Sequence, residues 1–150
     1  MLSKPVDENM DINKIMEVLP HRFPMLLVDR ILSVSADKCQ GIKNVTINEA
    51  YFQGHYPGMP IMPGVLILES MAQTGAVILL ANEAYAGMIP VIGAIENVKY
   101  KRPVVPGDQL LIDVELLWLR NSIGKISATA KVEGDLAAQM EMTFKLLPGK

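Results

Sequence analysis

Cysteine is nearly absent from the sequence. Cys39 is the single cysteine among 150 residues, so no disulfide can form within the chain, and no cysteine and histidine pair has the spacing of a zinc site. We therefore expect a fold that needs no disulfide, no metal and no cofactor. Such a protein suits a reducing compartment, and we expect the cytoplasm.

A long uninterrupted apolar run is also missing. The most apolar segment, residues 65–81, contains Glu69, Ser70, Gln73 and Thr74, which is too polar for a membrane span. The N-terminal residues mix acidic and basic side chains without an apolar run or a small-residue cleavage pattern, unlike a secretory signal. We expect no association with a membrane.

Positive charge is not in excess. The chain has 14 Lys and Arg against 16 Asp and Glu, a net charge of −2. No long basic run with interleaved aromatic residues is present, so the electrostatic attraction to phosphates that nucleic-acid binding needs is missing. We expect no nucleic-acid partner.

The composition is that of a globular protein. Half of the residues are apolar and a fifth are charged. A chain of this length buries roughly two thirds of the surface of its unfolded form, enough for a core. No repeat, low-complexity tract or linker divides it. We expect a single domain, residues 1–150, with a folded unit from about residue 12 to 147.

Two helices are predicted. Asp11 is a suitable N-cap for a short amphipathic helix that Pro20 stops. In residues 65–81, apolar side chains occupy every face of the helical wheel. A helix that is apolar on all sides is enclosed by the rest of the protein rather than laid on its surface.

Strands are predicted on both sides of this central helix. Residues 25–46 indicate two short strands, broken at Asp37 and Gly41. Clear period-2 alternation follows in three later runs, which turn signals separate, and predicts an antiparallel meander. These runs are residues 112–119, whose apolar face would carry Ile112, Val114, Leu116 and Trp118, then residues 125–132 and residues 139–146.

The combination is an α+β arrangement, an antiparallel sheet curled around one long helix. Such a sheet leaves edges, and a second copy of the chain could pair with one of them.

Residues 54–66, GHYPGMPIMPGVL, contain prolines at every third position, 57, 60 and 63. Proline restricts its own φ and moves the preceding residue away from helical angles, so this loop is a stiff strut. His55 stands at its start, where the imidazole is aimed at little entropic cost. A lone loop histidine is usually structural, but in this setting we predict a catalytic one.

The strut leads into the start of the central helix. Pro63 suits a first helical turn, so Gly64 and Val65 present backbone N–H groups without partners inside the helix. Such a helix start can act as an oxyanion hole. Glu69 is the only ionisable residue of residues 65–81, and we expect burial to favour its neutral, proton-donating form. The alternative is a buried acid satisfied by backbone amides.

An imidazole, an acid and an oxyanion site suit proton removal next to a carbonyl, coupled to loss of a group at the next carbon. Dehydration of a 3-hydroxyacyl thioester is a reaction of this class. His55 would take the α-proton, the Gly64 amide would hold the enolate-like oxygen, and Glu69 would protonate the departing hydroxyl.

These residues resemble a known family. GHYPGMPIMPGVL together with LESMAQTGA resembles the active-site signature of the 3-hydroxyacyl-[acyl-carrier-protein] dehydratases of type II fatty acid synthesis, the FabZ type, which have a hotdog fold. LPHRFPMLLVDR (19–30) and KRPVVPGDQL (101–110) resemble further stretches of that family. Tyr56 stands where the family more often has phenylalanine, which keeps the aromatic body and adds a hydroxyl.

The resemblance implies several properties. His55 and Glu69 would be the catalytic pair, and the Gly64 amide would polarise the thioester carbonyl. The substrate would be carried by acyl carrier protein. Each site would lie at a homodimer interface, with the histidine from one subunit and the glutamate from the other, and three dimers would form a hexamer. A glutamate at 69, where related dehydratase/isomerases carry aspartate, favours a dehydratase without isomerase activity.

Further polar residues have two interpretations each. Gln73 lies four residues after Glu69 on the same helix face, so it could hydrogen-bond Glu69 or serve as a packing amide. Lys99, Lys101 and Arg102 form a basic patch that could dock an acidic carrier protein or be a solvated strand end.

Three other groups of residues receive structural roles. We expect His21 and Arg22 to tie loop backbone together, and we assign no catalytic role to Asp29 and Arg30. Of the ten methionines, those near the proposed site are more simply core filling than the wall of an acyl tunnel. They are Met59, Met62 and Met71.

Two alternative functions remain open. A hotdog thioesterase would bind the same acyl thioester but needs a positioned water and normally lacks this His-then-Glu signature. A non-catalytic acyl-binding module would be expected to carry a DNA-binding segment or to have lost one of the acid–base residues, and neither feature is seen in the sequence.

Overall fold

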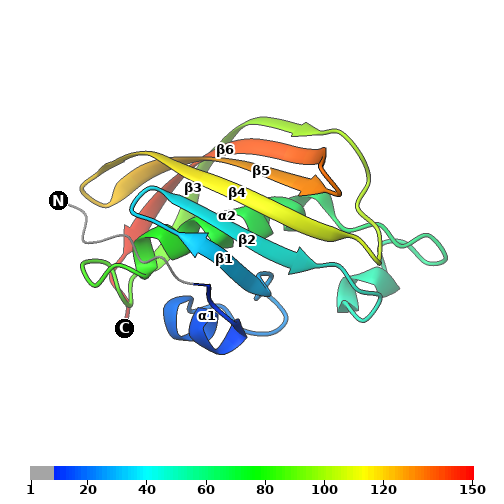
Figure 1. Cartoon of the computed structure of the whole chain (residues 1–150), viewed down its shortest axis with the longest axis horizontal. Helices are drawn as coiled ribbons and strands as arrows, with labels where there is room; N and C mark the ends of the chain where they lie inside the picture. Colours follow the sequence, from blue (N-terminus) through cyan, green and yellow to red (C-terminus); the bar gives the residue numbers. More distant parts are fainter. Residues whose placement is uncertain (1–8) are drawn as a thin grey trace.

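The computed structural model describes residues 9–150, which form one curved antiparallel sheet around a long helix (Figure 1). The strand order in the sheet is β1-β2-β4-β5-β6-β3. The elements are α1 (Ile12–Val18), β1 (Arg30–Val34), β2 (Lys38–Asn44), a 3₁₀ helix η1 (Ala50–Gln53), α2 (Gly64–Leu80), β3 (Ile89–Tyr100), β4 (Gln109–Arg120), β5 (Ile123–Val132) and β6 (Asp135–Leu147). The predicted α+β architecture is confirmed.

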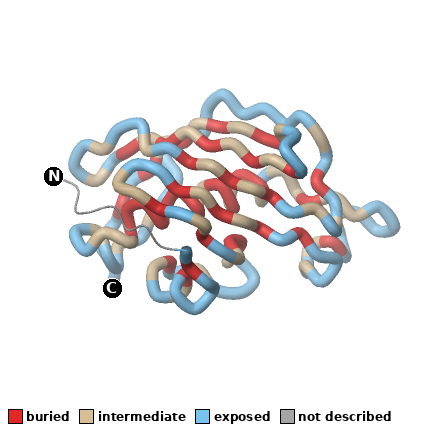
Figure 2. The backbone as a smooth tube through the Cα atoms, viewed as in Figure 1, coloured by how far each residue is buried: buried red, intermediate tan, exposed pale blue. Residues whose placement is uncertain are grey.

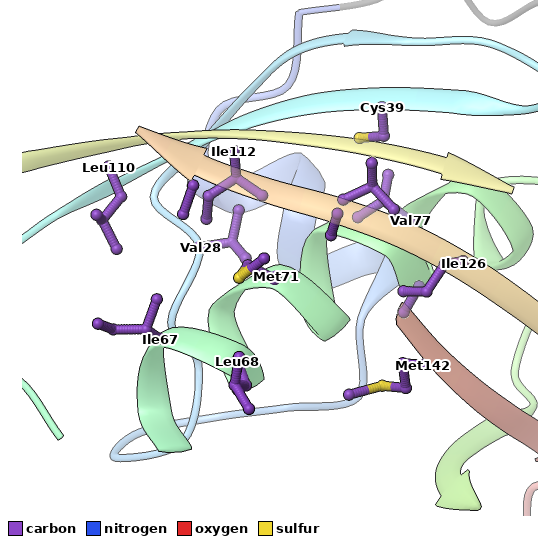
Figure 3. Close-up of a cluster of buried hydrophobic side chains, with 14 of the residues drawn as sticks. Val28, Cys39, Ile67, Leu68, Met71, Val77, Leu110, Ile112, Ile126 and Met142 are labelled. Atoms are coloured by element: carbon purple, nitrogen blue, oxygen red, sulfur yellow. The ribbon is translucent and has the colours of Figure 1, made fainter. Parts of the chain in front are cut away.

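The central helix is enclosed, as its apolar pattern predicts. Most residues of α2 are buried. Figure 2 shows buried residues along α2 and at alternate positions of the strands that cover it. In Figure 3, Met71 and Val77 of α2 lie in one buried cluster with Ile112, Ile126 and Met142 of the sheet. Each such side chain stabilises the fold by about 1.5–3 kcal/mol through burial.

The first helix follows its sequence signals. Asp11 is its N-cap, with the Asp11 side chain accepting a hydrogen bond of 3.0 Å from the Lys14 N–H. The helix ends at Val18, two residues before Pro20. This cap satisfies one of the N–H groups that a helix start leaves without a partner.

Trp118 is a point where the alternation rule gives the wrong face. The pairing of β4 with β5 is irregular between Leu116 and Trp118, and an extra residue at a bulge reverses the alternation beyond it. The Trp118 side chain is therefore 45% exposed, instead of lying on the buried face with Ile112 and Val114.

Gly41 does not break a strand, contrary to the prediction, whereas the break near Asp37 is confirmed by the turn between β1 and β2. Gly41 lies within β2, where a Cβ atom would be only 3.0 Å from Cγ2 of Thr74 on α2. A glycine is needed there because the helix approaches the sheet closely. From sequence alone, a glycine of this kind looks the same as a glycine that marks a turn.

The strand β3 was not predicted. Pro90 and Gly93 interrupt its apolar pattern, and its pairing with β6 shifts between Ile92 and Ala94. β3 is an edge strand, and all its residues except the half-buried Pro90 are exposed. Six large hydrophobic side chains of this strand contact solvent: Ile89, Val91, Ile92, Ile95, Val98 and Tyr100.

Within residues 9–150, none of the helices combines the length and the apolar character that crossing a membrane requires.

Candidate active site

The backbone around His55 fixes the direction of its ring. The His55 N–H donates to the carbonyl of Tyr51 in η1 (3.1 Å), and the His55 carbonyl accepts from the Ile61 N–H (3.0 Å). The ring atom Nδ1 lies 2.6 Å from the Ile61 carbonyl oxygen. A carbonyl can only accept, so Nδ1 carries a proton, and the neutral form of the ring then has its lone pair on Nε2.

The proline strut is anchored to the rest of the fold. The Met62 N–H donates to the Val104 carbonyl (2.8 Å), and Tyr56 and Met59 exchange two backbone hydrogen bonds. The Tyr56 ring stacks on the His55 ring at 4.1 Å between centroids. These contacts hold the half-buried imidazole, and among residues 9–150 its ring hydrogen bond is made by Nδ1 and not by Nε2.

The start of α2 presents free amide groups. Pro63 is the N-cap, and its carbonyl accepts hydrogen bonds from Leu66 and Ile67. In residues 9–150, no backbone acceptor is bonded to the N–H groups of Gly64 and Val65. These groups point out of the positive end of the helix, as the prediction requires.

Gly64 is closely covered by an aromatic ring. A Cβ atom at this position would lie 2.9 Å from Cζ of Tyr100, at the end of β3. The missing side chain therefore lets the Tyr100 ring pack directly against the helix start.

Glu69 occupies the next turns of the same helix and is held by Gln73. The Gln73 Nε2 amide donates to Glu69 Oε1 at 2.8 Å, as the spacing of the two residues predicts. Gln73 itself is buried and accepts a hydrogen bond from the Leu27 N–H (2.8 Å), while its Nε2 also donates to the Met25 carbonyl (2.6 Å). The backbone donor at Leu27 fixes which end of the amide faces Glu69.

His21 also lies beside Glu69, which the sequence analysis missed. Its Nε2 is 3.7 Å from Glu69 Oε1, and its Nδ1 is buried without a hydrogen-bond partner among the described residues. Burial lowers the pKa of His21 below its usual 6.5, although the Glu69 carboxylate acts in the opposite direction. Arg22 does tie backbone together as expected, through the carbonyls of Met16 and Leu19 at the end of α1.

Glu69, Gln73 and His21 are the polar residues that line an otherwise apolar pocket. Its floor runs along one stripe of α2, where small side chains leave room between the helix and the sheet. The other lining residues are Ala72, Gly75, Ala76 and Leu79 of α2, Pro90, Val91 and Ile92 of β3, Ile126 of β5, and Met142, Phe144 and Leu146 of β6.

A second hollow surrounds the helix start. Gly64 lines it together with Tyr100, Lys101 and Arg102. The Arg102 guanidinium is also paired with Asp108 at 3.2 Å, whereas Lys101 is exposed and makes no side-chain hydrogen bond or ion pair among the described residues. Two of the three basic residues predicted for docking thus lie next to the predicted oxyanion hole, and Lys99 lies outside the hollow.

One chain does not unite His55 with Glu69. Within residues 9–150, His55 and Glu69 share no hydrogen bond or ion pair, and His55 lines neither the pocket at Glu69 nor the hollow at Gly64. His55 is linked through the Ile61 carbonyl to the hollow at Gly64, and Glu69 opens into the apolar pocket. The chain carries two separate parts of the predicted site.

Comparison with known proteins identifies the family. The model of the FabA-like domain matches residues 19–141. The 3-hydroxyacyl-[acyl-carrier-protein] dehydratase FabZ of Desulforamulus reducens is 54% identical over 138 residues, which cover 91% of this chain and 97% of that protein. The FabZ protein of Caldicellulosiruptor saccharolyticus is 52% identical over 137 residues, 91% of this chain and 98% of that protein. The chain belongs to the FabZ family.

Solved structures agree with this family on the fold. A dehydratase heterocomplex from Xenorhabdus doucetiae superposes with a TM-score of 0.75 at 20% identity, covering 91% of each chain. A hypothetical thioesterase from Streptococcus pneumoniae superposes with a TM-score of 0.60 at 11% identity, covering 80% of this chain and 86% of that one. The predicted hotdog fold is confirmed for this FabZ-family chain, and these distant likenesses concern the fold alone.

Sequence reasoning could not have placed His21 in the FabZ site. Its contact with Glu69 joins a loop before β1 to the middle of α2, and no local pattern indicates which way the imidazole turns. Tyr100 was missed for a related reason, because the strand that carries it was not predicted.

Proposed function

We propose that the chain dehydrates (3R)-hydroxyacyl-[acyl-carrier-protein] to trans-2-enoyl-[acyl-carrier-protein] in fatty acid biosynthesis. As a member of the FabZ family it is a hydro-lyase. The observation that best supports the mechanism is the His55 ring, whose Nδ1 is bound to the Ile61 carbonyl while Nε2 is free to accept a proton.

The reaction follows from the three groups. Neutral His55 removes the α-proton through Nε2, and the N–H groups of Gly64 and Val65 hold the oxygen on which negative charge develops. Protonated Glu69 gives its proton to the 3-hydroxyl, the C–O bond breaks and water leaves. The cycle closes when His55 loses its proton to solvent and Glu69 regains one. No metal or other cofactor takes part.

The assembly we propose is a homodimer with shared sites. His55 and Glu69 lie in separate parts of one chain, and the exposed apolar edge strand β3 is available for pairing with a second copy. Pairing along this edge would bring His55 of one subunit to Glu69 of the partner subunit. Three such dimers would form the hexamer implied by the family.

The apolar pocket behind Glu69 is suited to the acyl chain. Its walls on α2, β3 and β6 are apolar apart from Glu69 and Gln73. An alkyl chain entering it would leave water while its hydroxyl stays at the carboxyl group, which agrees with the position of Glu69 as the acid.

The carrier protein would approach from the opposite side, at the hollow near Gly64. Lys101 and Arg102 line this hollow, and Lys99 lies nearby on β3. Positive side chains there would attract an acidic carrier and place its thioester carbonyl at the Gly64 amide. We further propose that residues 1–150 act as one domain in the cytoplasm.

Hydration of crotonyl thioester, followed by loss of the enoyl absorbance, tests this function on the purified protein. His55→Ala and Glu69→Ala should each abolish the reaction and leave the oligomer intact. A protein that instead releases free thiol from acyl thioesters would be a thioesterase. A protein that binds acyl thioesters without either reaction would be a binding module.

A further inference from the structure

The loop before β1 brings a second imidazole to the proposed acid. Among residues 9–150, Nδ1 of His21 is buried without a hydrogen-bond partner. A buried N–H without an acceptor is costlier than a buried lone pair, because a strong donor then loses its hydrogen bond to water. The favoured neutral tautomer of His21 therefore has its lone pair on Nδ1 and its proton on Nε2.

This tautomer directs a donor at Glu69. Nε2 lies 3.7 Å from Glu69 Oε1, the same oxygen that accepts the hydrogen bond from Gln73. Protonation of an oxygen that faces two N–H donors is unfavourable, because the added proton would point at other hydrogens. When Glu69 is protonated, the acidic proton belongs on Oε2, away from these donors.

No other charged group among the described residues competes for this position. The Arg22 guanidinium donates to the carbonyls of Met16, Leu19 and His21 instead. The strands β3, β5 and β6 line the pocket with apolar side chains alone. Glu69 therefore faces the amide of Gln73 and the imidazole of His21 as its polar neighbours in this pocket.

We propose that His21 is a positioning residue for Glu69, which keeps the deliverable proton on Oε2 and stabilises the carboxylate that forms when this proton is transferred. The proposal rests on the proposed role of Glu69 as the acid. The separation of 3.7 Å is longer than a hydrogen bond. Such contacts at catalytic groups often shorten as the reaction proceeds, and negative charge on Glu69 would attract the Nε2 proton.

An interaction that strengthens as charge develops lowers the barrier of the chemical step and leaves substrate binding nearly unchanged. The His21 donor should therefore affect kcat more than KM. A structural role in the loop would lower the amount of folded protein and leave kcat per folded subunit unchanged.

The variants His21→Phe and His21→Gln separate these roles, since glutamine can place an N–H near the position of Nε2 and phenylalanine cannot. With crotonyl thioester, we expect His21→Phe to lower kcat about tenfold, the order of one hydrogen bond to a charged group, and to change KM less than about twofold. His21→Gln should stay within about threefold of the wild type, as a restored neutral donor would.

The background of Glu69→Gln gives a second comparison. There no acid remains to be positioned, so His21→Phe should change the residual rate by less than about twofold. An equal loss in both backgrounds, equal losses in the two His21 variants, or a wild-type kcat for His21→Phe would each overturn the proposal. Full activity of Glu69→Ala would show that Glu69 is not the acid of the reaction. An inactive wild-type protein would reject the proposed function as a whole.

The tautomer can be measured without any variant of His21. The chain has two histidines, so ¹⁵N-histidine labelling gives two imidazoles, and His55→Asn leaves the signals of His21 alone. We expect Nδ1 of His21 to be unprotonated and Nε2 protonated at pH 7–8. A proton on Nδ1, or a positively charged ring at this pH, would contradict the proposal even if the variants failed to fold.

Discussion

Lys43 Nζ lies 2.5 Å from Glu49 Oε1 and ties β2 to the turn that leads to His55. Lys43 is 3% exposed and is the one buried charged side chain among residues 9–150. Its ammonium group also lies 3.4 Å from Asp29 Oδ2. This cluster has no reacting group, so its effect should be on stability and on the position of the His55 loop.

Lys43→Met should destabilise the protein, because two partly buried carboxylates would then face each other without a cation. We expect a loss of about 2 kcal/mol in the free energy of unfolding, below the value for a fully buried pair since both acids keep some contact with water. Urea denaturation measures it. Lys38→Met, at an exposed position of the same strand, is the matched control and should change little.

Shared sites predict complementation between two inactive variants. When His55→Ala and Glu69→Ala subunits exchange freely, half of the dimers are mixed, and each mixed dimer has one intact site of two. Activity should therefore return to about a quarter of the wild-type value. The control mixes His55→Ala with the double variant, which leaves no intact site. Failure to recover after confirmed subunit exchange would indicate sites contained in one chain.

The size of the apolar pocket should limit the acyl chain. Ala76 lines this pocket on α2, so Ala76→Leu would fill space that a long chain needs. We expect kcat/KM for a ten-carbon substrate to fall by more than about tenfold, while crotonyl thioester stays within about threefold, because each excluded methylene costs roughly 0.8 kcal/mol. Ala84→Leu, at an exposed position outside the pocket, is the control. Equal losses for both substrates would place the acyl chain elsewhere.

The sequence predicts those parts of the fold in which the residue pattern is compatible with only one kind of secondary structure. The all-apolar helix and the alternating runs of β5 and β6 correspond to α2 and to two strands with a buried face. The edge strand β3 escapes this rule. Its apolar residues face solvent in one chain, so no buried face forces an alternating pattern.

The site shows the same division. His55, Gly64 and Glu69 could be selected because the proline strut, the helix start and the lone acid of an apolar helix each have a local physical reason. His21 reaches Glu69 across 48 positions of the chain, and only the packing of the loop before β1 decides that contact. No local pattern contains this information.

Charge at the second hollow should affect the carrier-bound substrate selectively. Arg102 is engaged with Asp108, so the test uses Lys99 and Lys101 and leaves that pair intact. The double variant Lys99→Glu and Lys101→Glu should raise KM for acyl carrier protein substrates more than KM for a small thioester, with the difference shrinking at high salt. Lys38→Glu with Lys145→Glu, an equal charge change at exposed positions elsewhere, is the control. Equal effects on both substrates would exclude docking at this patch.

Cys39 should make the protein sensitive to alkali. Burial, with a smaller contribution from Asp113, raises the pKa of its thiol from 9.0 to about 12. In the unfolded chain this thiol ionises from about pH 9, whereas in the folded protein it keeps its proton, so the unfolded state binds fewer protons and stability falls as pH rises from 9 to 12. The same direction holds for Tyr51, whose pKa burial also raises.

Cys39→Ala isolates this contribution. The cavity lowers the stability of this variant at pH 8. Between pH 9 and 10.5, however, its free energy of unfolding should fall less steeply than that of the wild type, by up to about 1.4 kcal/mol per pH unit. Urea midpoints at half-unit pH intervals measure both slopes. Parallel slopes for the two proteins would show that the thiol ionises as easily in the folded protein as in the unfolded chain. This result would contradict the raised pKa that we derive from the burial of Cys39 in β2.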